Sequence, residues 1–203
     1  MRKLYLTLFV SALFFVGCSN DDDDTKVQIE ISEDEVTSNS IAISWSALDD
    51  AIYYDVSITP DDNEQSVMVS GSTSYTFTDL KAGTEYNIMV QAGSSIESES
   101  IIGEGTIAIT TETLPEEFVG TWEYSYESYS QIYVFNQDGT GTFTSISSDE
   151  PQNIMWSIED DEIVIKYFND NGTSYTEIES YSFNEDKNIL MIGSTFYFLQ
   201  NEE

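Results

Sequence analysis

The sequence of 203 residues contains no histidine, one cysteine, three prolines and six lysines and arginines. Without histidine, the chain lacks the usual base that activates a serine or cysteine nucleophile and the commonest zinc and copper ligand. Catalytic triads built on histidine are therefore excluded. A single cysteine has no partner for a disulfide within the chain.

Basic residues are scarce, whereas 38 residues are Asp or Glu, so the formal net charge is -32. Such a surface repels nucleic acid phosphates and anionic lipid headgroups, because binding to both depends on clustered Lys and Arg. We therefore expect no nucleic acid partner. The composition is 40% hydrophobic and 13% aromatic, which favours packed cores over disorder. The length fits two modest domains.

The N-terminus has the pattern of a secretory signal over residues 1–17. Arg2 and Lys3 precede an uncharged run, residues 4–16, which ends at Gly17 and Cys18. This run is shorter than the roughly 20 residues that a membrane-spanning helix needs, so a cleaved signal is favoured over a permanent anchor.

Residues Phe15-Val16-Gly17-Cys18 resemble a bacterial lipoprotein lipobox, with Phe15 where Leu is usual. The resemblance implies cleavage before Cys18 and acylation of that cysteine; the alternative is a free or disulfide-bonded thiol. Because the mature chain keeps only four lysines, stable anchoring must come from the acyl chains.

Residues 18–26 form an acidic segment that includes the run Asp21–Asp24. Repulsion between these carboxylates predicts an extended, solvated tether. The stretch from Cys18 to Asp24 also resembles the acidic export signal of Bacteroidetes surface lipoproteins. That resemblance implies an outer-membrane lipoprotein facing the cell exterior, with the inner leaflet of that membrane as the alternative.

Residues 27–113 alternate apolar and polar side chains, which predicts half-buried strands. Turn-forming residues separate these segments at a spacing typical of a β-sandwich. The predicted strands include 41–45, 54–58, 74–77, 86–90 and 107–109.

The same region resembles a fibronectin type III domain. Trp45 stands where that family buries a tryptophan on its second strand, and Tyr54 matches an aromatic residue on its third strand. Residues 79–86 look like the tyrosine corner, in which the resemblance implies that Tyr86 hydrogen-bonds back to the backbone. The chain has no Arg-Gly-Asp tripeptide that would support integrin binding.

Residues 114–117 are polar, include a proline and are predicted to link two domains. The second domain, residues 118–203, contains 17 of the 27 aromatic residues. Turn residues at 138–139, 160–161, 171–172 and 186–188 predict consecutive hairpins and therefore an antiparallel meander of about eight strands. Such a meander can close on itself and so remove its open edges. Beyond a first strand around Trp122, the predicted strands are 132–135, 141–146, 154–158, 163–168, 175–183, 189–192 and 195–199.

Residues 118–122, Phe-Val-Gly-Thr-Trp, resemble the Gly-x-Trp opening of lipocalin-like domains, which implies that Trp122 packs across a barrel end. Residues 133–143 are similar to the second hairpin of the small lipocalin-like domains of secreted Bacteroidetes proteins. The expected fold is therefore all-β: a fibronectin type III sandwich followed by a small lipocalin-like barrel or meander.

An eight-stranded barrel is just wide enough to be filled by side chains or to hold one small ligand. The aromatic residues can either fill it or form an exposed platform on which sugar rings stack. Both alternatives stay open. The candidate ligand-binding residues are Trp122, Tyr124, Tyr126, Tyr129 and Trp156.

Carboxylates suggest two further chemistries. Glu123 and Glu127 are spaced so that they could act as the acid pair of a glycoside hydrolase, although acids on an exposed strand face more often serve solubility. Acidic turns at 61–64, 160–162 and 169–172 could bind structural calcium, but none has the spacing of a dedicated calcium loop.

We therefore expect a non-enzymatic, lipid-anchored surface protein with no cofactor besides the covalent lipid on Cys18. Its expected role is binding of a glycan, a protein or a small apolar molecule. The alternative is a structural or accessory subunit of an envelope complex, and a carboxylate-based hydrolase is the remaining alternative.

Overall fold

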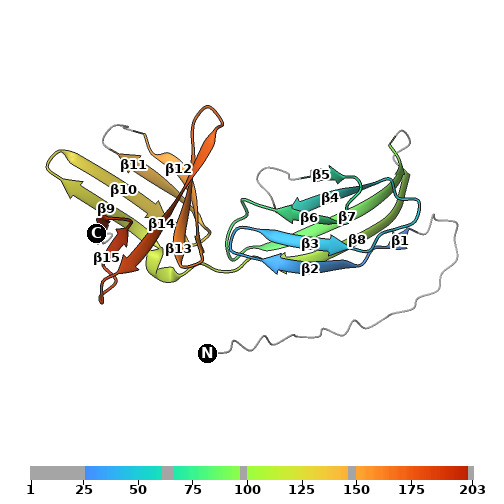
Figure 1. Cartoon of the computed structure of the whole chain (residues 1–203), viewed down its shortest axis with the longest axis horizontal. Coiled ribbons are helices and arrows are strands. Elements are labelled where there is room, and N and C mark those ends of the chain that lie inside the picture. The colour runs from blue at the N-terminus through green and yellow to red at the C-terminus, as the bar shows by residue number, and fades with distance from the viewer. Residues whose placement is uncertain (1–25, 61–65, 97–99, 146–149, 201–203) are drawn as a thin grey trace.

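The computed structural model describes residues 26–60, 66–96, 100–145 and 150–200. The predicted signal peptide, Cys18, the acidic run and the calcium candidate at 61–64 lie outside these residues. Two β domains follow one another along the longest axis of the molecule (Figure 1), so the predicted all-β fold is confirmed. No helix in the described ranges is long and apolar enough to cross a membrane.

The first domain is a sandwich of two sheets. One sheet has the strand order β1-β8-β7-β4-β5, and the other has the order β2-β3-β6. The strands are β1 Val27–Gln28, β2 Ile31–Val36, β3 Ile41–Trp45, β4 Tyr53–Thr59, β5 Ser66–Val69, β6 Ser74–Phe77, β7 Glu85–Ser95 and β8 Ser100–Thr110.

Alternating side chains from both sheets fill the core of the sandwich. Trp45 and Tyr54 are buried and meet edge to face, with ring centroids 5.4 Å apart. The Tyr54 hydroxyl also accepts a hydrogen bond from the Leu48 backbone N–H at 3.0 Å. Buried Tyr86 accepts a hydrogen bond from the Lys81 N–H at 2.9 Å, which confirms the predicted tyrosine corner.

The second domain is a closed antiparallel barrel of eight strands, preceded by the 3-10 helix η1 Glu116–Phe118. Each strand pairs with the next, and β16 returns to pair with β9. The strands are β9 Gly120–Tyr126, β10 Tyr129–Phe135, β11 Thr140–Ser145, β12 Gln152–Glu159, β13 Glu162–Phe168, β14 Ser174–Phe183, β15 Ile189–Ile192 and β16 Thr195–Gln200.

The predicted hairpin turns are present. Asp160 and Asp161 both have positive φ, at 49° and 65°, as a two-residue type I′ hairpin requires. Gly139, Gly172 and Lys187 also have positive φ in the turns after β10, β13 and β14. These local preferences bring neighbouring strands into register, so the meander closes.

The barrel interior is packed with aromatic rings at the end that holds η1. Phe118 contacts Trp156, Tyr181 and Phe183 with ring centroids 4.8 to 5.3 Å apart. The Trp122 indole N–H donates to the Phe118 carbonyl oxygen at 2.7 Å, and the Trp156 indole N–H donates to the Asn136 carbonyl oxygen at 3.1 Å. This end of the barrel is therefore closed by side chains.

The two domains are joined by more than the chain between them. Leu114 and Ala82 are buried against the barrel core, and the Ala82 N–H donates to the Asp138 carbonyl oxygen at 2.8 Å. Gly139 lies in this contact: a Cβ there would come within 3.4 Å of a Leu114 methyl carbon and 3.9 Å of the Ala82 Cβ. The predicted linker at 114–117 is thus partly packed.

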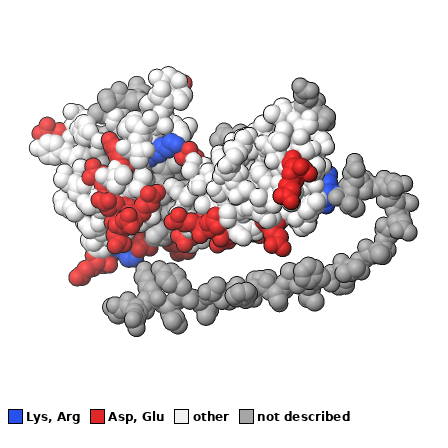
Figure 2. Space-filling model, turned by 45° about the vertical axis from the view of Figure 1, so that its right-hand side comes forward, with Lys and Arg blue, Asp and Glu red and all other residues white. Residues whose placement is uncertain are grey.

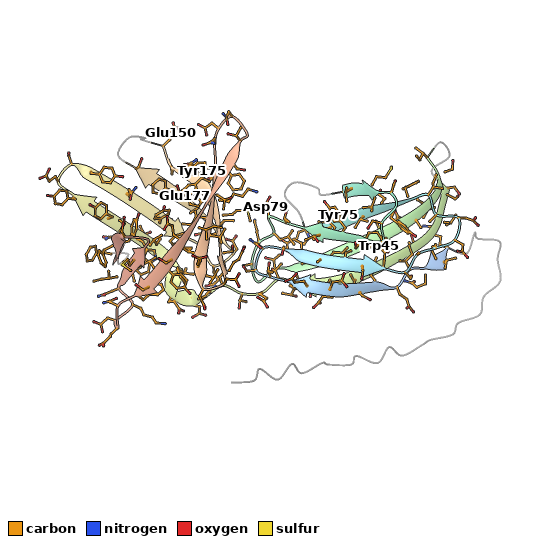
Figure 3. The ribbon with its side chains drawn as sticks, in the orientation of Figure 1. Trp45, Tyr75, Asp79, Glu150, Tyr175 and Glu177 are labelled. Atoms are coloured by element: carbon orange, nitrogen blue, oxygen red, sulfur yellow. The ribbon has the colours of Figure 1, made fainter. Side chains whose placement is uncertain are left out.

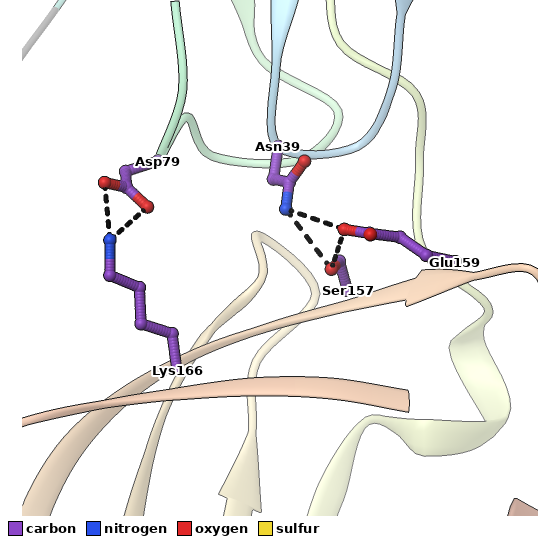
Figure 4. A network of polar contacts seen from close by, with 5 residues as sticks. All are labelled: Asn39, Asp79, Ser157, Glu159 and Lys166. Atoms are coloured by element: carbon purple, nitrogen blue, oxygen red, sulfur yellow. Dashed lines mark hydrogen bonds and ion pairs between the residues drawn. The ribbon is translucent and has the colours of Figure 1, made fainter. Parts of the chain in front are cut away.

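Polar side chains add a second set of contacts between the domains (Figure 4). The Lys166 Nζ lies 2.7 Å from both carboxylate oxygens of Asp79. The Asn39 amide donates to the Ser157 hydroxyl at 3.2 Å and to Glu159 at 3.4 Å. A hollow of about 230 Å³, lined by residues of both domains, lies beside these contacts.

The tyrosine corner provides a test of how the sandwich is stabilised. In Tyr86→Phe, the half-buried Lys81 N–H loses the Tyr86 hydroxyl as its acceptor, so we expect the free energy of unfolding to fall by about 1 kcal/mol. Chemical denaturation followed by circular dichroism measures this change. Tyr75→Phe is the matched control, because no hydrogen bond of the Tyr75 hydroxyl is found among the described residues. Equal stability of the two variants would contradict the role of the corner.

Candidate functional site at the open end of the barrel

The end of the barrel opposite η1 presents tyrosines and polar side chains to the interior. Because side chains alternate along a strand, residues on the same side as buried Trp122 also point inward. On β9 and β10 these are Tyr124, Gln131 and Tyr133. Gln131 pairs with Tyr124 across the two strands, and Tyr133 pairs with Trp122. On β13 and β14, the paired residues Tyr167 and Tyr175 both point inward, as do Ile165 and its partner Glu177.

The rings at this end contact one another around the barrel. Tyr167 stacks on Tyr175 with centroids 4.7 Å apart and planes 9° from parallel. Tyr133 lies 4.7 Å from Phe143 and 5.3 Å from Tyr197, measured between ring centroids. Tyr124 links Tyr197 to Tyr129, with centroid distances of 6.3 and 6.0 Å. We call this set of eight aromatic residues the tyrosine ring: Tyr124, Tyr129, Tyr133, Phe143, Tyr167, Tyr175, Tyr197 and, at its rim, Tyr126.

Hydrogen bonds orient the hydroxyl groups of this ring. Tyr167 donates to the Glu177 carboxylate at 3.1 Å, so Tyr133 donates its own proton to the Tyr167 oxygen at 2.6 Å. Tyr197 donates to the Gln131 side-chain oxygen at 2.9 Å. Figure 3 shows Tyr175 and Glu177 on β14, on the same side of the barrel as Glu150.

A hollow of about 450 Å³ opens beside the tyrosine ring. Phe143 contributes an apolar surface, while Gln152, Asn169, Glu150 and Asp170 contribute polar groups. The Gln152 amide donates to the Asn169 side-chain oxygen at 3.0 Å, which holds both amides in place. A flat ring bordered by amides and carboxylates suits a ligand that combines ring faces with hydroxyl groups.

Burial changes the acidity of the inner tyrosines. Loss of hydration raises the pKa of the Tyr133 hydroxyl to about 12, the hydrogen bond with Tyr167 opposes this rise, and the nearby Glu177 carboxylate adds to it. Burial is also the main cause that raises the pKa of Tyr167 and of Tyr197. These hydroxyls therefore stay protonated and act as neutral donors over the physiological range.

The structure separates the residues that the sequence marked as ligand-binding candidates. Trp122 and Trp156 have exposed fractions of 0% and 2%, and both belong to the closed end of the barrel. Tyr124 is half-buried, and Tyr126 and Tyr129 are exposed at the open end. Among the predicted ligand-binding residues, only Tyr124, Tyr126 and Tyr129 can therefore still form a stacking surface. The predicted lipidation site, Cys18, lies outside the described residues.

Several members of the site were not among the residues that the sequence predicted to bind a ligand: Gln131, Tyr133, Phe143, Gln152, Asn169, Tyr167, Tyr175, Glu177 and Tyr197. Strand alternation was a usable signal for Gln131, since it lies midway between Tyr129 and Tyr133 on one face. For Asn169 no comparable signal exists, because it lies in the turn after β13.

The acidic candidates are placed differently from the expectation. Glu123 points to the outside of the barrel, since its neighbour Trp122 points inward, and Glu127 lies beyond the end of β9 with a φ of 54°. The two carboxylates therefore do not share one strand face. Within the described ranges, no group of three or more Asp, Glu or Cys residues is placed to hold a metal ion, and this includes Asp160, Asp161 and Glu162.

Comparison with known proteins identifies the first domain. Residues 26–104 match the family model of the fibronectin type III domain. The sandwich is therefore a fibronectin type III domain, and the chain joins such a domain to a closed eight-stranded barrel.

Solved structures give partial similarities. A structure described as a myokine is 22% identical and covers 43% of this chain and 99% of its own, with a TM-score of 0.35. A segment of two fibronectin type III domains from chicken tenascin is 13% identical and covers 74% of this chain and 97% of its own, with a TM-score of 0.34. The chitinase ChiA74 from Bacillus thuringiensis is 14% identical with a TM-score of 0.36, and the match covers 89% of this chain but 28% of the chitinase. The comparison with curated proteins gave no match.

The buried tyrosines predict a loss of stability in alkali. An unfolded tyrosine ionises near pH 10, whereas Tyr133 in the folded chain ionises only near 12, so the unfolded state loses its proton first. The stabilisation is complete below pH 10 and is lost as the pH rises further, by about 2 kcal/mol from Tyr133 alone at pH 12.

Denaturant unfolding at increasing pH measures this loss, and ultraviolet absorbance of tyrosinate follows ionisation. Tyr133→Phe should show a shallower decline than the unaltered protein. Ionisation of every tyrosine in one step near pH 10 in the folded chain would contradict the assignment.

Proposed function

We propose that this protein is a lipid-anchored surface protein whose barrel binds carbohydrate at the tyrosine ring. The observation that carries the proposal is the arrangement of exposed ring faces beside fixed amides and hydroxyls at the open end of the barrel. Flat aromatic faces pack against sugar rings, and side-chain amides and carboxylates pair with sugar hydroxyls.

The packing of the barrel interior favours a polar ligand at the open end over a small apolar ligand inside the barrel. Phe118, Trp122, Trp156 and Phe183 occupy the closed end, so an apolar molecule has little space to enter deeply. At the open end, the exposed rings of Tyr129 and Tyr175 are followed on the same strand face by Gln131 and Glu177. Gln152 lines the hollow together with Phe143. The ligand class with both ring faces and many hydroxyl groups is a glycan.

The resemblance of residues 118–122 and 133–143 to lipocalin-like domains is consistent with a ligand at one end of a small barrel. The fibronectin type III domain would hold this end away from the membrane, since the barrel is fixed to the sandwich by the contacts of Asp79, Ala82 and Leu114. The alternative, an accessory subunit without its own ligand, predicts no glycan binding by the isolated protein.

A glycan array with the purified protein, followed by titration calorimetry of the best ligand, tests the site. Tyr129→Ala removes an exposed ring of the site and should weaken binding about tenfold. Phe198→Ala is the matched control: Phe198 is exposed to 51% and Tyr129 to 44%, but Phe198 points outward from β16. No bound glycan, or equal loss in both variants, would reject the proposal.

The membrane anchor rests on Cys18 and has its own test. We expect cleavage before Cys18 and two or three acyl chains on the new first residue, which anchor the protein almost irreversibly. Cys18→Ala should release the protein from the membrane fraction, and mass spectrometry of the unaltered protein should find the lipid. An unmodified, soluble mature chain would reject the anchor, while protease access in intact cells would distinguish the outer from the inner face.

A further inference from the structure

One strand of the barrel has an edge without a neighbouring strand. β14 pairs with β13 from Ser174 to Ser180 but pairs with β15 only from Tyr181 to Phe183. The hydrogen bond from the Gly193 N–H to the Ser180 carbonyl oxygen, at 2.8 Å, marks the point where contact with β15 ends. Among the described residues, the stretch from Ser174 to Glu179 therefore has a strand on one side only, and an edge of this kind presents unpaired backbone groups.

This edge is regular and accessible. Its six residues would extend about 20 Å at the usual rise of a strand. Every residue from Ser174 to Ser180 is exposed, with Ile178 at 58%. The register with β13 continues without a bulge, and the stretch contains no proline or lysine, which are common means of blocking an edge. Figure 1 shows the hairpin of β13 and β14 projecting from the barrel.

Acidic and uncharged side chains alternate along the edge. Glu177 and Glu179 point to the inner side, together with Tyr175, whereas Thr176 and Ile178 point outward. The nearest lysine on β13, Lys166, holds Asp79 of the sandwich through an ion pair at 2.7 Å. The carboxylates of the edge are therefore not neutralised by that lysine.

A second copy of this chain is a poor occupant of the edge. Two such edges paired antiparallel about Glu177 would place Glu177 opposite its own copy, and like charges directly opposite are destabilising. The net charge of -32 on each copy adds long-range repulsion. Figure 2 shows this excess of acidic side chains on the face that it displays.

We propose that the β14 edge, residues Ser174–Glu179, binds an extended basic segment of another protein as an added strand. Backbone hydrogen bonds to the edge would supply the docking geometry. Lys or Arg at alternate positions of the partner would face Glu177 and Glu179, and an intervening apolar residue would face Ile178. The inference goes beyond carbohydrate binding and does not depend on it, although the edge shares with the glycan site Glu177, which accepts a hydrogen bond from the Tyr167 hydroxyl.

Fluorescence anisotropy of three labelled peptides with the full, detergent-solubilised protein tests the proposal. The first peptide has the repeat Lys-Val-Lys-Val-Lys, the second has Glu in place of each Lys, and the third has the composition of the first with its lysines adjacent. We expect binding of the alternating basic peptide, at least tenfold weaker binding of the rearranged one, and none of the acidic one. Equal binding of the two basic peptides would overturn the proposal, since charge alone would then explain it.

Charge reversal at the edge sharpens the test. The double variant Glu177→Lys with Glu179→Lys should lose affinity for the basic peptide at least tenfold and gain affinity for the acidic one. The matched control, Glu185→Lys with Asp186→Lys, makes the same change of charge in the exposed turn after β14 and should keep the original preference. The same response in both double variants would overturn the assignment to the edge.

Hydrogen exchange on the unaltered protein gives a readout that does not depend on a variant folding. Backbone amides between Ser174 and Glu179 should become protected when the alternating basic peptide binds, and absence of protection would reject strand addition. A dimer in sedimentation that protects the same amides without peptide would instead identify a second copy as the occupant. Tyr129→Ala should leave peptide binding unchanged, so failure of the glycan site and failure of the edge are distinguishable.

Discussion

The organisation of the barrel depends on the aromatic packing around Phe118. This residue lies in η1, before the first barrel strand, and its ring fits among Trp156, Tyr181 and Phe183. Its carbonyl oxygen also accepts the Trp122 indole N–H, so the polar group of the largest buried side chain is satisfied. Because these rings fill one end of a small barrel, any ligand must approach from the other end, where the rings are exposed and accompanied by amides and carboxylates.

The contact between the domains is made by turns that also stabilise each domain separately. The turn that contains Asp79 and Ala82 also presents the Lys81 N–H to the tyrosine corner, and the turn at Asp138 and Gly139 also joins β10 to β11. Buried Ala82 and Leu114 exclude water from the contact. The ion pair between Lys166 and Asp79 helps to fix the orientation of the barrel on the sandwich. The barrel is therefore held at a defined position on the sandwich, and its open end keeps a fixed relation to the first domain.

The acidic composition has a structural consequence in the barrel. Short strands β15 and β16 close the sheet only over part of the length of β14, which leaves a regular strand edge. Glu177 and Glu179 on this edge oppose pairing with a copy of the same chain, as inward-pointing charges do in many β proteins. The charges that oppose pairing with a second copy also define, in our proposal, the chemistry of a strand that the edge would accept.

Much of the fold was predictable because it follows from local rules. Strand alternation, the turns at 160–161 and 171–172 and the tyrosine corner each depend on a few neighbouring residues, and the structure contains all of them. The site was predictable only in part. Trp122, Tyr124 and Tyr126 alternate with polar residues, so the sequence by itself determined that they share one face of β9, but not that this face points inward or which of them is buried. Tertiary structure decided that, because η1 covers one end of the barrel and the unequal lengths of β14, β15 and β16 leave the other end open.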